Sequence, residues 1–247
     1  MRDGWGGNPI KSCNFAVITV TEMNVGIIVA MKAELEHLLS SLDNLKATEI
    51  SGMEFHAGTL GGNDVVAMQC GIGKVNAAMG TMLMLKAFAP ELIINTGIAG
   101  GTGGDAGIMD LVVADEVAFH DVWCGPGNVR GQVQGCPPRF SCAAGNAILQ
   151  RLKELPGLKH GLIASGDMFV DTPGELQRIL TMYPEAVAVD MESGAIAQVC
   201  HRMGVPFTIL RVVSDYPGAD DHIEQYLGFW EKAPAATFAA VRELLEG

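Results

Sequence analysis

The stretch AVAVDMESGAIAQVC, residues 186–200, passes from one kind of secondary structure to another. Residues 186–189 form a continuous apolar run, which is typical of a β-strand covered on both faces. Two carboxylates, Asp190 and Glu192, follow the run, and small and apolar residues from 194 to 203 then predict a helix. A buried strand that leads directly into a helix is the building unit of an α/β fold.

The same alternation continues in both directions along the chain. Strands are predicted at residues 25–30, 53–60, 64–71, 91–97, 110–120, 161–165 and 207–215, and helices at 32–41, 74–88, 143–155, 173–182 and from the last strand to Glu246. Gly61, Gly62 and Asn63 lie between two of these strands and predict a β-hairpin. We therefore expect an α/β fold: a single-domain three-layer sandwich in which helices flank a mixed, mostly parallel central sheet.

Composition and charge exclude some classes of function. The chain has 247 residues, of which 49% are hydrophobic, and this is enough for one domain with a sizeable core. The net charge of −12 argues against nucleic acid or an anionic membrane as a partner. Residues 23–247 are expected to form the domain, and residues 1–22 a poorly ordered leader without the pattern of a signal peptide.

The six cysteines have no CxxC or metal-finger spacing. We therefore expect reduced thiols in a cytoplasmic protein, with a Cys136–Cys142 disulfide as the minor alternative.

In sheets of this kind, ligands bind beyond the carboxyl ends of the strands. The residues expected there are rich in acids and glycines: Met31, Glu34, Cys70, Gly71, Gly73, Gly97 to Gly101, Phe169, Asp190, Met191, Glu192, Ser214 and Asp215. The sequence therefore predicts a ligand pocket at this edge of the sheet, with acids on its rim.

Each of these features also has a purely structural interpretation. Glu34 fits an acid that complements the helix dipole, Asp215 a helix N-cap, and Glu192 a solvated acid in a first helical turn. The pair His120–Asp121 could begin a metal site, but no third ligand follows at a useful spacing. The motif GIGK, residues 71–74, lacks the second half of a phosphate-binding P-loop, and no GxGxxG pattern indicates a dinucleotide site.

Six motifs together resemble the nucleoside phosphorylase/hydrolase superfamily. They are VGIIVAMKAE, CGIGKVNAA, IINTGIAGG, SGDMFV, VDMESGAIAQVCHRMGVPF and LRVVSD, and they follow one another in the order and spacing of that superfamily. Within it, the sequence is most similar to the bacterial 5′-methylthioadenosine/S-adenosylhomocysteine nucleosidases. The resemblance extends from Met23 to the end of the chain and implies the fold of that family.

The resemblance also implies roles for individual residues. Glu34 would activate the attacking water, and Asp215, oriented by Ser214, would interact with N7 and the exocyclic amine of the purine. Glu192 would bind the 2′- and 3′-hydroxyls of the ribose. The other implied substrate-binding positions are Met31 and Met191 at the ribose, Phe169 stacked on the adenine, Val170 at the purine edge, Cys70 near the water and Ile223 over the sugar. The implied supporting residues are Gly97, Ala99, Gly100 and Arg211.

The two catalytic acids suit cleavage of an N-glycosidic bond, which builds positive charge on the ribose and negative charge on the leaving base. Asp215 would have to hold a proton near N7, which needs a desolvated site, whereas Glu34 should stay ionised to accept a proton from water. A helix N-terminus favours the ionised form of Glu34. Two acids in opposite roles follow the logic of inverting glycosidases, and this chemistry needs no metal or organic cofactor.

The distribution of arginines favours a hydrolase over a phosphorylase. A phosphorylase must hold phosphate, usually with arginines, and there is none between Arg2 and Arg130. We expect Arg211 to pair with a pocket carboxylate such as Glu192 instead. A futalosine hydrolase, another purine nucleosidase or phosphorylase of the superfamily, and a non-catalytic nucleoside-binding protein are the alternatives. We also expect a homodimer formed through the methionine-rich helix 74–88.

Overall fold

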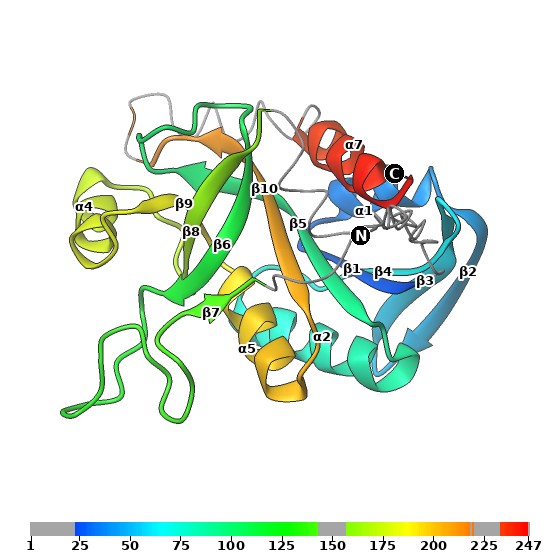
Figure 1. Ribbon diagram of the computed structural model, residues 1–247, viewed down its shortest axis with the longest axis horizontal. Helices are drawn as coiled ribbons and strands as arrows, with labels where there is room; N and C mark the ends of the chain where they lie inside the picture. The colour runs from blue at the N-terminus through cyan, green and yellow to red at the C-terminus, as the bar shows by residue number, and fades with distance from the viewer. Residues whose placement is uncertain (1–22, 143–156, 218, 220–232, 247) are drawn as a thin grey trace, which may run out of the picture.

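The computed structural model describes residues 23–142, 157–217, 219 and 233–246. The strands are β1 (Asn24–Val29), β2 (Asp43–Ile50), β3 (Met53–Leu60), β4 (Asn63–Gln69), β5 (Leu92–Gly101), β6 (Leu111–Phe119), β7 (Phe140–Ser141), β8 (Lys159–Ser165), β9 (Ala186–Asp190) and β10 (Phe207–Asp215). The helices are α1 (Lys32–Leu39), α2 (Lys74–Phe88), α4 (Pro173–Met182), α5 (Ser193–Met203) and α7 (Ala233–Glu246) (Figure 1). No helix in these ranges is long and apolar enough to cross a membrane.

The predicted α/β alternation is confirmed in the described part of the chain, with small shifts at the ends of some elements. The hairpin at Gly61–Gly62 is also confirmed, because it joins β3 to β4 in antiparallel register. Strand β2 was not predicted, since its residues are exposed up to Ile50 and show no apolar alternation. The predicted helix 143–155 and the leader 1–22 lie outside the described residues.

The sheet is mixed, as expected, but the prediction of a plain three-layer sandwich is wrong. The long strand β5 pairs with β1 through its first half and with β9 through Gly100 and Gly101 at its end, while β10 runs parallel to it throughout. Since β10 also pairs with β6, β6 with β8, and β8 with β9, these five strands close into a barrel-like ring.

The sheet is also not mostly parallel. Among the described strands, five pairings are parallel and five antiparallel. The alternation predicted buried strands correctly, but it could not show that β9 would fold back against β5.

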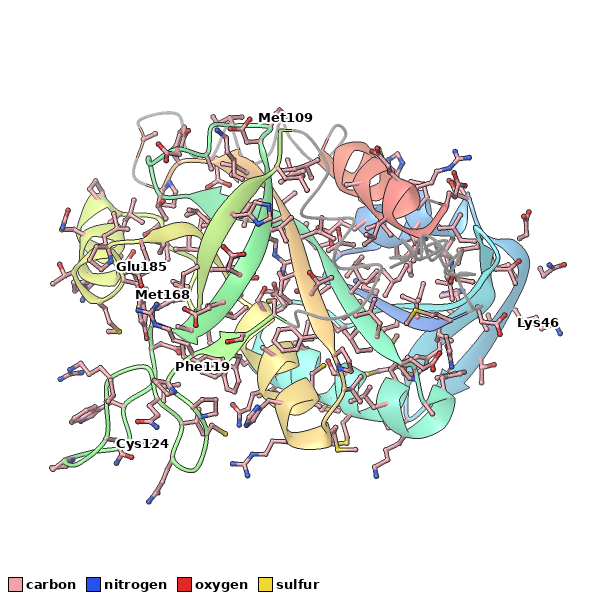
Figure 2. The ribbon with its side chains drawn as sticks, in the orientation of Figure 1. Lys46, Met109, Phe119, Cys124, Met168 and Glu185 are labelled. Carbon is pink, nitrogen blue, oxygen red and sulfur yellow. The ribbon has the colours of Figure 1, made fainter. Side chains whose placement is uncertain are left out.

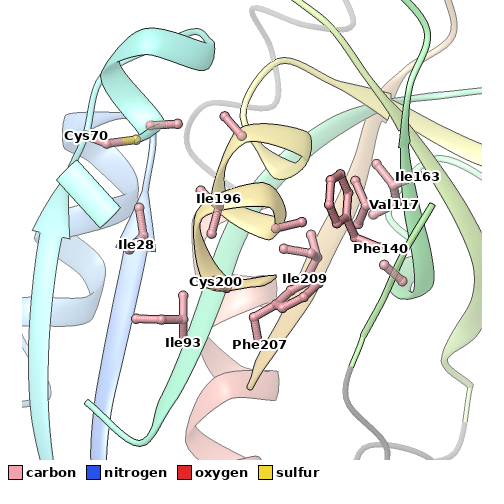
Figure 3. Packing of buried hydrophobic residues seen from close by; sticks show 14 of the residues in the cluster. Ile28, Cys70, Ile93, Val117, Phe140, Ile163, Ile196, Cys200, Phe207 and Ile209 are labelled. Carbon is pink, nitrogen blue, oxygen red and sulfur yellow. The ribbon is translucent and has the colours of Figure 1, made fainter. Parts of the chain in front are cut away.

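Helices cover both sides of the sheet. On one side, α2 and α5 pack on a core in which Ile196 and Cys200 face Ile93 and Ile209 (Figure 3). On the other side, Leu38 of α1 and the apolar residues of α7 cover β1, β4 and β5. Both clusters are apolar, and most buried polar residues of β5, β9 and β10 lie from the middle of these strands to their carboxyl ends. The site lies at these ends.

Candidate active site

A cavity of about 700 Å³, counted with its open mouth, lies at the strand ends. Its size suits a small organic ligand. Fourteen residues predicted for the site line it: Met31, Glu34, Gly97, Ile98, Ala99, Gly100, Phe169, Val170, Asp190, Met191, Glu192, Arg211, Ser214 and Asp215. The structure thus brings together residues that are up to 184 positions apart in the sequence, Met31 and Asp215.

Glu34 is a buried carboxylate in the first turn of α1, with 5% of its surface exposed. Its Oε2 accepts hydrogen bonds from the amides of Ala30 and Met31, at 3.1 and 3.0 Å, and its Oε1 accepts one from the amide of Ile98, at 3.2 Å. Burial raises the pKa of Glu34 above its ordinary value, although the charge of Arg211 and the three amides act in the opposite direction. The side chain is fixed in place and is basic enough to accept a proton.

The fixed position of Glu34 requires a glycine in β5. A Cβ added to Gly97 would lie 2.6 Å from Oε1 of Glu34 and 3.3 Å from Nη1 of Arg211, and the φ angle of Gly97 is +154°. Real Cβ atoms essentially never come within 3.0 Å of such a neighbour, so the contact with Glu34 would force its carboxylate to shift. Gly97 therefore allows the carboxylate and the guanidinium to approach the same point of the strand.

Arg211 pairs with a carboxylate of the cavity, as predicted, but this partner is Asp190 and not the Glu192 named as an example. The guanidinium of Arg211 donates from Nε and Nη2 to Oδ2 of Asp190, at 3.0 and 2.6 Å, and both side chains are 2% exposed. Asp190 is the last residue of β9, whereas Glu192 lies beyond the strand, in the turn to α5. This ion pair gives Asp190, whose role the sequence left open, a structural function in the wall of the cavity.

Glu192 points instead to the N-terminus of α2. Its Oε1 accepts a hydrogen bond of 2.9 Å from the amide of Gly73, and the residue is 6% exposed. Burial, and after it the neighbouring carboxylate of Asp190, raise the pKa of Glu192 to about 7. The carboxyl group of Glu192 therefore accepts a hydrogen bond from Gly73 and changes its protonation state near neutral pH.

Ser214 and Asp215 form the end of β10. The hydroxyl of Ser214 donates to Oδ1 of Asp215, and it also lies 3.3 Å from the carbonyl oxygen of Ala99. Both residues are buried, with 1% and 3% of their surfaces exposed. The contact orients the carboxyl group of Asp215 in a desolvated position, as expected for an acid that handles a proton.

Apolar side chains form the mouth of the cavity. Phe169 is 42% exposed and Ile72 is 50% exposed, although both line the cavity. Val170, next to Phe169, is buried. The partly exposed aromatic ring of Phe169 suits stacking against a flat ligand.

Five predicted positions are not part of the described cavity. Gly71, Gly73, Gly101 and Cys70 do not line it. Cys70 is buried behind it, and its thiol donates to the carbonyl oxygen of Gly71, at 3.1 Å. Burial raises the pKa of Cys70 to about 12, so this thiol stays neutral. Ile223 lies outside the described residues.

Other residues contribute to the site but were not predicted. Asn95 accepts a hydrogen bond of 2.6 Å from Nη2 of Arg211, and Ser193 donates to Asp190, so both extend the buried network. Thr96 lines the cavity with a buried hydroxyl that has no hydrogen-bond partner in the described structure. These residues lie within an apolar strand or at the start of a helix, where no local pattern distinguishes them from core positions.

The cavity combines four buried carboxyl groups, Glu34, Asp190, Glu192 and Asp215, with one guanidinium that is already paired. Such a set can donate and accept protons and can stabilise positive charge on a bound molecule. In the described part of the chain, no group of three or more His, Cys, Asp and Glu side chains could hold a metal ion.

Comparison with known proteins gives a consistent result. A family model described as the phosphorylase superfamily matches residues 24–246. The 5′-methylthioadenosine/S-adenosylhomocysteine nucleosidase of Geobacillus thermodenitrificans is 43% identical over 212 residues, which are 83% of this chain and 90% of the relative.

Two solved structures are also similar. The nucleosidase of the same name from Neisseria meningitidis, in complex with methylthio-immucillin-A, matches with a TM-score of 0.85 and 35% identity over 91% of this chain and 99% of its own. The futalosine hydrolase of Helicobacter pylori matches with a TM-score of 0.84 and 27% identity, over 91% and 97% of the two chains.

Proposed function

The chain belongs to the phosphorylase superfamily and, within it, to the 5′-methylthioadenosine/S-adenosylhomocysteine nucleosidases, and we propose how its cavity performs their reaction. The enzyme hydrolyses the N-glycosidic bond of both nucleosides, which releases adenine and a 5-thioribose product. The main support for assigning this reaction to the cavity is the arrangement of two buried acids, Glu34 and Asp215, that come from different strand ends and line the same space.

Glu34 is proposed as the general base. The oxygen of a water molecule attacks the anomeric carbon of the ribose, and Glu34 accepts one proton of that water while the other remains on the new sugar hydroxyl. The raised pKa of Glu34 supports this role, because a carboxylate in water is a weaker base.

Asp215 is proposed as the acid that serves the leaving base. As the bond between the anomeric carbon and N9 breaks, its electron pair moves into the purine, and the proton held by Asp215 is delivered to N7. The hydroxyl of Ser214 supports the required orientation of the carboxyl group.

The remaining proposed roles concern binding. Glu192 holds the 2′- and 3′-hydroxyls, Met31 and Met191 contact the ribose, Phe169 stacks on the adenine, and the backbone of Val170 contacts the purine edge. Arg211, through Asp190, keeps positive charge near the acids without being free to bind an anion.

Hydrolysis without phosphate is the first prediction. The only arginine of the described cavity is paired to Asp190 at 2.6 Å, so there is no free cation for phosphate. With 5′-methylthioadenosine as substrate, we expect equal rates of adenine release with and without phosphate, and free methylthioribose as the sugar product. Product analysis by mass spectrometry checks this.

A strict requirement for phosphate, with a sugar 1-phosphate as product, would contradict the prediction. No release of adenine in either buffer would favour a futalosine-type substrate or a protein that binds nucleosides without cleaving them.

A homodimer is proposed through α2, as the second prediction. Val75, Met79 and Met82 are 68%, 49% and 36% exposed and lie on one face of this helix, and Ile72 continues the face to the cavity mouth. An apolar stripe of this kind is typical of a subunit interface. We expect a mass in solution of twice 26.1 kDa, measured by light scattering, and a monomer for the double variant Val75→Asp, Met79→Asp.

The control variant is Leu45→Asp, because Leu45 is similarly exposed, at 43%, but lies on β2. It should leave the dimer intact. A wild-type monomer at micromolar concentration would refute this interface.

Residues 23–247 are further proposed to form one catalytic domain that acts in the cytoplasm. The family match over residues 24–246 supports a single domain. Among the described residues, Cys70, Cys124, Cys136, Cys142 and Cys200 are free thiols, which is consistent with a reducing compartment.

A further inference from the structure

Two successive amides at the N-terminus of α2 bind acids from two different parts of the site. The amide of Gly73 donates to Oε1 of Glu192, at 2.9 Å, and the amide of Lys74 donates to Oδ1 of Asp167, at 2.7 Å. Glu192 is the proposed ligand of the sugar hydroxyls. Asp167 begins the segment that carries Phe169, the proposed ligand of the base. The start of one helix therefore connects the sugar side of the cavity to its base side.

The side chain of Lys74 closes a ring of contacts at this point. Its Nζ lies 2.7 Å from Oδ2 of Asp121, and the same oxygen accepts the amide of Asp167, at 2.8 Å. Asp167 in turn accepts the amide of Lys74. Each of the three residues Lys74, Asp121 and Asp167 thus contacts the other two. Lys74 begins α2, whereas Asp121 and Asp167 lie in the segments that follow β6 and β8.

The side chains packed next to these three residues leave Lys74, Asp121 and Asp167 little freedom to move. Nζ of Lys74 lies 5.3 Å from the centre of the Phe119 ring, at the end of β6. A Cβ on Gly194 would be 2.4 Å from the ring of Phe119, and a Cβ on Gly166 would be 2.5 Å from the ring of His120. Figure 2 labels Phe119, the last residue of β6, and Met168, which lies in the segment after β8. The aromatic side chains therefore support both α5 and the segment before Phe169.

We propose that Lys74, Asp121 and Asp167 are positioning residues that fix the distance between the sugar-binding acid Glu192 and the base-binding segment of Phe169. This inference rests on the proposed function. None of the three residues lines the described cavity, so they act through Gly73, Glu192 and Phe169 and do not touch the substrate. The bond to be cleaved lies between sugar and base, and a misplacement of about 1 Å can cost about 100-fold in rate.

The ring of contacts also accounts for two motifs that the reaction leaves unexplained. Lys74 is the lysine of GIGK, and Asp121 is the acid of the His120–Asp121 pair. An ordinary surface ion pair would contribute little to stability and nothing to the rate. Lys74 and Asp121 differ from such a pair, because each side chain is only 25% exposed and Asp121 also binds the backbone of Asp167.

The test compares variants of the full chain with 5′-methylthioadenosine as substrate. Lys74→Met and Asp121→Asn are each expected to lower kcat by about 10- to 100-fold. The dissociation constant for adenine should change by less than about 3-fold, because adenine occupies the base side alone. The double variant should be little worse than either single one, since both remove the same contact.

Asp167 provides a rescue experiment that separates positioning from loss of fold. Asp167→Asn keeps an oxygen that accepts the amide of Lys74 and should retain most of kcat, whereas Asp167→Ala should resemble Lys74→Met. The matched control is Lys32→Met, which removes an exposed ion pair with Glu36 on α1 and should leave kcat unchanged.

Three results would overturn the inference. The first is a kcat for Lys74→Met and Asp121→Asn that matches that of Lys32→Met. The second is a loss of adenine binding as large as the loss of kcat, which would show a local defect of the base site. The third is an equal loss in Asp167→Asn and Asp167→Ala. A wild-type enzyme that releases no adenine would instead refute the proposed function, and the inference with it.

Discussion

The variant Asp215→Asn is expected to lose kcat by about 10²- to 10⁴-fold with 5′-methylthioadenosine, the usual contribution of a general acid. Asparagine has nearly the same shape as aspartic acid, and its side-chain oxygen still accepts the hydrogen bond from Ser214. It cannot give up a proton to N7, so the purine would have to leave as an anion. Steady-state kinetics of adenine release checks this prediction.

The expected loss should occur without loss of structure or of base binding. The melting temperature of Asp215→Asn should stay close to the wild-type value, and adenine should still bind in calorimetry. Asp64→Asn is the control, because Asp64 is an exposed carboxylate on β4, away from the cavity. A kcat near the wild-type value in Asp215→Asn would remove this residue from its assigned role.

The variant Glu34→Gln is expected to show a loss of similar size, about 10²- to 10⁴-fold in kcat, for a different reason. Glutamine cannot accept the proton of the attacking water. Its amide group would also face one of the three backbone amides that now bind Glu34, at a cost of about 1 to 3 kcal/mol in the free energy of unfolding. Urea denaturation measures this second effect separately from the kinetics.

The pH dependence provides a further check on Glu34. Burial raises the pKa of Glu34, and the base must be ionised to act. The wild-type kcat should therefore fall as the pH is lowered toward this raised pKa. Since Glu192 has a pKa of about 7, it contributes to the same fall, and Glu34→Gln should remove only part of it. The control Glu36→Gln, two positions further along α1 and exposed, should keep both the rate and the profile. An unchanged rate in Glu34→Gln would exclude it as the base.

The sequence predicted which residues meet at the site because strand ends are a topological property. Apolar runs such as residues 186–189 show where a strand ends. In an α/β sheet, ligands bind at the carboxyl ends of the strands, so Glu34, Glu192 and Asp215, which stand at or just beyond three such ends, are expected at one edge. Which side chains at that edge form ion pairs with one another depends on the orientation of single side chains. Whether Arg211 contacts Asp190 or Glu192 is decided by the direction of one Cα–Cβ bond at the end of β9, and no periodicity contains that information.

Closure of the sheet was unpredictable for a similar reason. The pairing of Gly100 and Gly101 with β9 involves two glycines at the end of β5, beyond the predicted strand 91–97, and glycines carry no apolar pattern. Strand β2 was missed because β-pairing at an exposed edge needs only backbone groups and no buried side chain. Cys70 follows directly after a strand whose end lies at the site, yet its side chain turns into the core.

The glycines of β5 have a consequence for the evolution of this enzyme. A Cβ would lie 2.6 Å from Glu34 at Gly97, 3.0 Å from Pro217 at Gly100 and 2.8 Å from Val213 at Gly101. Every amino acid that a single nucleotide change can substitute for glycine carries a Cβ. These three positions therefore have no single-nucleotide substitution that leaves their surroundings undisturbed, whereas a change of the exposed side chain of Phe169 at the mouth disturbs fewer packed neighbours.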